Sequence, residues 1–106
     1  MISIKQGDAF ALPVEVRLAD GGINIADIES VEFMLNDIRK VYPQTARYDA
    51  VDNMFYVPLT QEDTFSLPAD DTAMLDIRVH FVGGDVLGIQ QKQPIYVYDA
   101  TSEVVL

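Results

Sequence analysis

The sequence contains a single histidine, His80, which is the first residue to consider for catalysis. Apolar and polar residues alternate from Leu75 to Phe81, so His80 is expected on the outer face of a strand. A catalytic triad or a histidine metal site needs partners nearby in space, and the sequence identifies none. None of the four serines has the Gly-x-Ser-x-Gly setting of a nucleophile elbow: Ser3, Ser30, Ser66 and Ser102. We therefore expect no enzymatic activity and no catalytic residue.

Carboxylates are the other chemical candidates, and they recur in pairs: Asp49/Asp52, Glu62/Asp63 and Asp70/Asp71. Calcium takes about six to eight oxygens, which converging loops can supply, but the Asp-x-Asp-x-Asp-Gly spacing of a dedicated loop is absent. Glycoside hydrolysis needs two carboxyl groups about 5–10 Å apart across a cleft. Turns and helix caps also require Asp and Asn. We expect turn and cap roles, with no metal and no cofactor, and keep calcium in the acidic loops as the alternative.

Tyrosines are the candidates for binding. Tyr96 and Tyr98 are expected on one face of a strand, opposite Ile95 and Val97. An exposed tyrosine offers rigid apolar area with a polar tip, which suits a protein contact or a sugar platform. The alternative is partial burial at the rim of the fold, together with the other tyrosines: Tyr42, Tyr48 and Tyr56.

The segment Asp99–Leu106 is predicted to be a tail or an edge strand. It ends in three apolar residues, Val104, Val105 and Leu106. We expect them either to fold back onto the domain or to add to an open sheet edge near Ile95–Tyr98 through backbone hydrogen bonds. The predicted partner-binding residues are therefore Tyr96, Tyr98, Val104, Val105 and Leu106.

Alternating apolar residues predict the elements that position these side chains. The strand from Leu75 to Phe81 precedes a glycine turn at Gly83-Gly84, and Asp85–Ile89 forms the return arm of a hairpin. Other strands are predicted at 2–5, 10–18, 30–36, 38–42, 55–59 and 93–98, with Gly21-Gly22 as a second turn and edge positions for Pro13 and Pro58. The expected core is Phe10, Leu12, Val14, Val16, Val31, Phe33, Leu35, Phe55, Val57, Leu59, Leu75, Ile77, Val79 and Phe81.

One short helix is predicted at 60–67, where Thr60 caps the first turn and Pro68 ends the element. It is expected to connect two sheets, with Phe65 and Leu67 in the core. Turns every eight to twelve residues or so are typical of a sandwich. The whole chain, 1–106, is expected to form one all-β domain, an antiparallel sandwich of about seven or eight strands.

Composition narrows the choice of partners. Seventeen acidic and seven basic residues give a formal charge of −10, which repels nucleic acid and anionic membranes. Cysteine is absent, which excludes disulfides and thiolate sites. The first residues lack the pattern of a signal peptide, so we expect a cytoplasmic protein that binds neither nucleic acid nor membrane.

Three segments carry a family resemblance: Val41–Pro43, Phe55–Thr64, and Leu75–Val79 continuing to Gly83–Leu87. Together they resemble small immunoglobulin-like domains of tailed-phage and prophage structural proteins, including the N-terminal domain of baseplate upper proteins. In that group a strand ends in a short helix similar to Leu-Thr-Gln-Glu-Asp-Thr, and a hairpin strand with an Asp-Gly-type turn follows. The matching positions are structural, so no functional residue is carried over.

The resemblance implies an immunoglobulin-like sandwich that acts by docking, as a tail or baseplate component. Its partners would be other phage structural proteins or itself as a homo-oligomer, and it would reside in the host cytoplasm during assembly and then in the virion. The alternative function is a carbohydrate-binding module that uses the tyrosines. Coplanar exposed tyrosines would favour the carbohydrate module, whereas an exposed strand edge or apolar patch would favour assembly.

Overall fold

The computed structural model describes residues 3–18, 21–89, 93–102 and 104–106. Its helical elements within these ranges are η1 (Ile25–Asp27), a 3-10 helix, and α1 (Gln61–Phe65). Its strands are β1 (Ser3–Lys5), β2 (Phe10–Val14), β3 (Arg17–Leu18), β4 (Gly21–Gly22), β5 (Ile28–Leu35), β6 (Ile38–Tyr42), β7 (Arg47–Asp49), β8 (Met54–Leu59), β9 (Asp71–Phe81), β10 (Val86–Gly88) and β11 (Gln93–Tyr98).

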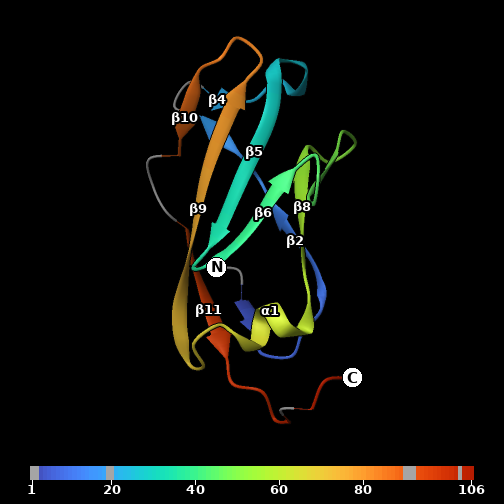
Figure 1. Ribbon diagram of the computed structural model, residues 1–106, viewed down its shortest axis with the longest axis vertical. Helices are drawn as coiled ribbons and strands as arrows, with labels where there is room; N and C mark the ends of the chain where they lie inside the picture. The colour runs from blue at the N-terminus through green and yellow to red at the C-terminus, as the bar shows by residue number, and fades with distance from the viewer. Residues whose placement is uncertain (1–2, 19–20, 90–92, 103) are drawn as a thin grey trace.

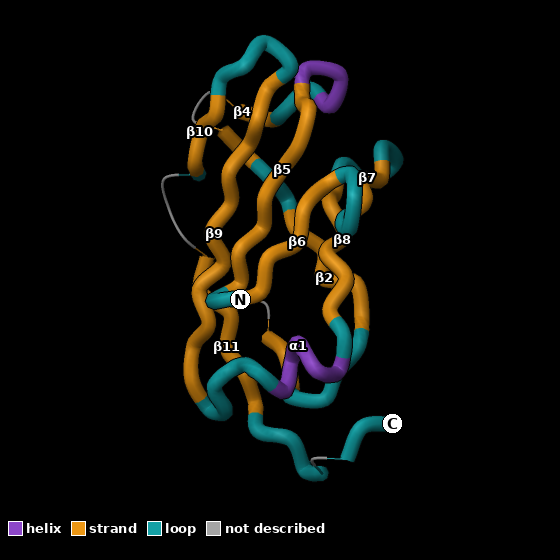
Figure 2. The backbone as a smooth tube through the Cα atoms, in the orientation of Figure 1, coloured by secondary structure: helices purple, strands orange, loops and turns teal. Residues whose placement is uncertain are grey.

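Two sheets form the body of the elongated molecule (Figures 1 and 2). The larger sheet has the order β1-β11-β9-β5-β6, with β10 also paired to β9, and the smaller sheet has the order β2-β8-β7. The predicted all-β character is confirmed. Two details of the prediction are wrong: the described residues form eleven strands, and β1 runs parallel to β11, so the larger sheet is mixed. Local alternation predicts a strand but not the direction of its neighbour.

The core lies between the two sheets. Phe33 of β5 and Phe55 of β8 are fully buried and bring their rings to 5.6 Å across it. Of the predicted core residues, Phe81 is only partly buried, although it packs against the core. The burial predicted for Phe10 is wrong, because this side chain is 36% exposed. Phe10 is the first residue of β2, so it lies at the end of the strand, beyond the buried side chains of Leu12 and Val14.

The strand β9 follows the predicted alternation. Leu75, Ile77 and Val79 are buried, and the residues between them face outward. The predicted hairpin is confirmed as well, since β10 pairs antiparallel with β9 and the turn contains Gly84 at a φ of 102°, a conformation that glycine adopts without strain.

Pro13 and Pro58 lie at positions where their strand is paired with only one neighbouring strand. Pro13 is on the edge strand β2, as predicted. Pro58 is on β8, which is central, but the pairing of β8 with β7 reaches only Tyr56, so at Pro58 the strand has β2 alone as a partner. The predicted continuous strand 10–18 is broken after Val14, where the chain leaves the smaller sheet and forms the β3–β4 hairpin. Gly21 and Gly22 belong to the strand β4 and not to a turn, and residues 19–20 before them lie outside the described residues.

The helix α1 connects the smaller sheet to the larger one, as predicted. Thr60 caps it: its side chain accepts from the N–H of Asp63, while the Asp63 carboxylate accepts from the N–H of Thr60. Lys40 of β6 forms an ion pair with Asp63 at 3.0 Å and ties the helix to the larger sheet. Leu67 is buried, whereas Phe65 is only partly so. Neither described helix is long and apolar enough to cross a membrane.

Candidate functional site

The outer surface of β11 and β9 carries an exposed apolar patch, which we call the tyrosine face: Met74, Pro94, Tyr96 and Tyr98. Alternate residues of a strand share a face, and directly paired residues share it across strands. Ile95 and Val97 are buried, so Pro94, Tyr96 and Tyr98 point outward. Met74 is paired with Pro94 and is 40% exposed. Alternation along the sequence places Pro94 with the two tyrosines, but the position of Met74 required the register between the strands.

The two tyrosine rings meet edge to face. Their centroids are 4.7 Å apart and their planes are inclined at 70°. Tyr98 is 52% exposed and Tyr96 is partly buried. A sugar ring stacks on flat aromatic area, and two rings at this angle do not form one coplanar platform. This geometry therefore removes the feature that would favour carbohydrate binding over a protein contact.

Carboxylates surround one end of the tyrosine face. Partial burial, followed by the nearby negative charge of Asp70 and Asp71, raises the pKa of Tyr96 above its ordinary value. Asp99 follows the strand directly, and its N–H donates to Asp70 at 3.3 Å. Lys5 is paired with Tyr98 and is exposed on the same side of the sheet, so this end of the face carries a positive charge as well as negative ones.

The backbone beneath the tyrosines is already paired on both sides. The strand β11 lies between β1 and β9, with Tyr96 opposite Ser3 and Tyr98 opposite Lys5. The hypothesis that a partner strand adds at Tyr96–Tyr98 is therefore wrong. Any contact at this face has to use side chains.

The tail places its apolar side chains in solvent. Val104, Val105 and Leu106 are exposed, and the described residues after Tyr98 form no strand. The backbone N–H of Leu106 donates to the side chain of Gln61 in α1 at 2.9 Å. Figure 1 shows the tail running past the end of the molecule that carries α1. The tail and the tyrosine face are thus two separate exposed apolar features.

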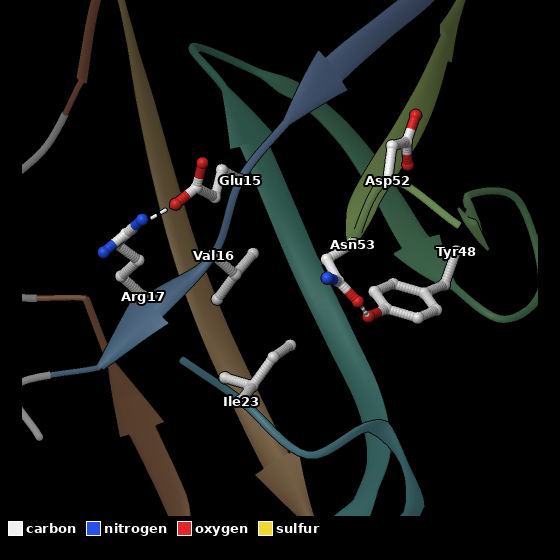
Figure 3. A pocket seen from close by; sticks show the side chains of 7 residues that line it. All are labelled: Glu15, Val16, Arg17, Ile23, Tyr48, Asp52 and Asn53. Carbon is white, nitrogen blue, oxygen red and sulfur yellow. Dashed lines mark hydrogen bonds and ion pairs between the residues drawn. The ribbon is translucent and has the colours of Figure 1, made fainter. Parts of the chain in front are cut away.

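A polar pocket of about 430 Å³ opens on another part of the surface, and the side chains that line it come from the β2–β3 connection, the segment after β4 and the β7–β8 turn (Figure 3). Its lining residues are Glu15, Val16, Arg17, Ile23, Tyr48, Asp52 and Asn53. The polar groups mostly pair within the protein: Arg17 with Glu15, Tyr48 with Asn53 at 2.9 Å, and Asp52 with Tyr56. Because these groups satisfy one another, the pocket offers few free partners to a ligand.

The remaining tyrosines are placed as the rim alternative predicted. Tyr42 and Tyr48 pack their rings on Phe55, at 5.3 and 4.9 Å. Tyr56 lies beneath the guanidinium of Arg47, which is 4.2 Å from its ring centroid. The Tyr42 contact joins β6 of the larger sheet to β8, whereas the other two contacts join β7 and β8 within the smaller sheet.

His80 and the paired carboxylates occupy structural positions. His80 faces outward, 3.6 Å from Glu29. Asp49 and Asp52 accept backbone N–H groups within their own turn, Asp63 caps α1, and Asp71 accepts from Thr72. These hydrogen bonds confirm turn and cap roles for Asp49, Asp52 and Asp63, whereas Asp71 is the first residue of the strand β9. Within the described residues no group of three or more His, Cys, Asp or Glu side chains is arranged to hold a metal ion.

Comparison with family models, with curated proteins and with solved structures found no match for the chain. The resemblance to phage immunoglobulin-like domains therefore remains a prediction from sequence.

Proposed function

We propose that the protein is a non-enzymatic docking module that binds another protein through the tyrosine face. The observation that carries this proposal is an apolar surface of Pro94, Tyr96, Tyr98 and Met74, in which the two tyrosines belong to a strand segment paired on both sides. Tyrosine and methionine are enriched at protein interfaces, and tyrosine supplies rigid contact area at low cost in conformational entropy.

The net acidity of the chain supports a partner with a basic surface. Asp70 and Asp71 lie close enough to Tyr96 to raise its pKa, and the formal charge of the whole chain is −10. Charges at the rim of an interface mainly speed association and exclude partners of the same sign. A cationic side chain of the partner would also be attracted to the exposed ring of Tyr98.

The biological setting that we propose is the assembly of a tailed-phage particle, with the partner being another structural protein of the tail or baseplate. Support for this setting comes from the sequence resemblance of Phe55–Thr64 and Leu75–Leu87. An immunoglobulin-like arrangement of the two sheets is part of the same proposal.

Photo-crosslinking in the source cells tests the docking surface. A photoreactive phenylalanine analogue placed in place of Tyr98 is expected to yield one discrete adduct, whose protein partner is identified by mass spectrometry. The matched control has the same analogue in place of Val51, which is 94% exposed in the β7–β8 turn. Equal adducts from both positions, or none from position 98, would rule out the tyrosine face as the docking site.

The same adduct tests whether the protein works in the assembly of a phage particle. Recovery of the adduct with purified phage particles supports a virion role, whereas an adduct with a protein absent from particles contradicts that role and leaves the docking proposal intact.

A kinetic measurement tests the charge of the partner. Against the purified partner, the double variant Asp70→Asn/Asp71→Asn is expected to associate about 3- to 10-fold more slowly at low salt. Asp37→Asn, an exposed change in the β5–β6 turn, is the control and should have little effect.

A further inference from the structure

The strand β10 presents an open edge at the margin of the larger sheet (Figure 1). Two backbone hydrogen bonds define its pattern: the N–H of Phe81 donates to the C=O of Asp85, and the N–H of Ile89 donates to the C=O of Ile77. In an antiparallel pair, hydrogen-bonded positions alternate. Leu87 therefore also bonds to β9, whereas the N–H and C=O groups of Val86 and Gly88 point away from it. No hydrogen bond from the described residues reaches these groups.

Two other sheet edges are protected, whereas this one is not. The edge strand β2 carries Pro13. On β6 the N–H of Val41 donates to the hydroxyl of Thr45, and its C=O accepts from the N–H groups of Thr45 and Ala46. Natural proteins use such prolines, charges and local caps to prevent pairing between edges. The triplet Val86–Gly88 has none of these features, and the side chains of Val86 and Leu87 are about half exposed, at 54% and 50%.

We propose that β10 pairs with β10 of a second copy of the chain, antiparallel about a twofold axis at Leu87. In this register Val86 lies opposite Gly88 of the partner copy, and the free N–H and C=O groups of the two residues satisfy one another. The twofold axis repeats this pairing between Gly88 of the first copy and Val86 of the partner copy, so four backbone hydrogen bonds form in total. Leu87 meets its own counterpart at a non-hydrogen-bonded position, where paired side chains are closest.

Charge favours a second copy at this edge over most other surfaces of the chain. A formal charge of −10 makes two copies repel one another in general. Val86, Leu87 and Gly88 are uncharged, and the ionic side chains of the adjacent strand have partners already: Arg78 binds Glu32, and His80 lies near Glu29. The paired triplets thus bring no unpaired charge together.

The contact is short, so the dimer is weak. A three-residue strand buries far less than the roughly 1,600 Å² of a standard stable interface. We expect a rapid monomer–dimer equilibrium that becomes visible only as the protein concentration approaches about 1 mM.

Disulfide trapping tests the register. The chain has no cysteine, so Leu87→Cys introduces one thiol per copy. At a non-hydrogen-bonded antiparallel pair the Cα atoms are about 4.5 Å apart, which a disulfide can span. Under mild oxidation Leu87→Cys is expected to form a linked dimer at least about 10-fold faster than Val82→Cys, which is exposed in the adjacent turn outside the paired triplet. Equal rates for the two variants would overturn the proposal.

A second measurement needs no cysteine. Sedimentation equilibrium of the unmodified protein should show the mean mass rising above 11.8 kDa with concentration. Leu87→Lys places two ammonium groups at the twofold axis and should abolish that rise, whereas Val82→Lys makes the same charge change outside the contact and should preserve it. A monomer at every concentration up to about 1 mM, or equal loss in both variants, would contradict pairing through β10.

Discussion

The ring of Phe33 in β5 lies 5.6 Å from the ring of Phe55 in β8, and this contact joins the larger sheet to the smaller one. Phe55 also touches Tyr42 and Tyr48, so three aromatic rings converge on one fully buried side chain. Aromatic contacts of this kind add to the stabilisation from burial.

Replacing Phe55 with alanine should therefore be among the most destabilising single changes. We expect Phe55→Ala to lower the free energy of unfolding by about 3–5 kcal/mol, as measured by urea denaturation. Phe10→Ala, at a 36% exposed position, should cost far less. Equal losses for the two variants would mean that the core does not lie where the contacts place it.

Glu32 should make stability depend on pH. Hydrogen bonds from Arg39 first, and then from Arg78, hold the pKa of Glu32 below its ordinary value of 4.5. A carboxyl group with a lowered folded-state pKa stabilises the protein above its unfolded-state pKa, and this stabilisation is lost as the pH falls through the folded-state pKa. Glu32→Gln should therefore cost about 0.5–1 kcal/mol at pH 7, a modest value because both arginines are largely exposed.

The difference in unfolding free energy between Glu32→Gln and the unchanged protein should shrink as the pH falls below about 4. Glu29→Gln is the matched control, since it removes the same charge from the same strand at an exposed position near His80 alone. A Glu32→Gln deficit that is the same at pH 3 and pH 7 would assign the effect to packing.

Calcium should leave the stability unchanged. Asp49, Asp52, Asp63 and Asp71 accept backbone N–H groups in turns, at the helix cap and at the start of β9, so they are already satisfied without a metal ion. Melting temperatures in about 5 mM calcium and in chelator are expected to agree within about 1 °C. A rise of many degrees in calcium would revive the loop-site alternative.

Removal of residues 104–106 should leave both sheets intact. Their side chains are exposed, and the backbone bond from Leu106 to Gln61 is the main tie to α1. One exposed hydrogen bond contributes about 0.5–1 kcal/mol, so the melting temperature should fall by only a few degrees. A truncated chain that unfolds would show that these residues belong to the core.

The sequence by itself determined which residues face inward. From Leu75 to Val79 and from Val31 to Leu35, alternation indicates a buried face because each side chain points opposite to its neighbour along the chain. The cap at Thr60 and the turns at Asn36 and Gly84 were equally readable, since capping and positive φ are local properties. The short strand β7 was missed, because Arg47–Asp49 is too short to show a period.

Only the tertiary structure decided how the strands are arranged and which surfaces are open. Tyr96 and Tyr98 were expected beside a free edge, yet β1 and β9 cover both sides of their strand, while the open edge belongs to β10. Met74 joins the tyrosine face through pairing with Pro94, twenty residues along the chain. Strand pairing is set by backbone hydrogen bonds between distant segments, and these bonds are nearly independent of the side chains that carry the alternation. The same residues are therefore compatible with several strand orders, and the packing of one sheet against the other selects among them.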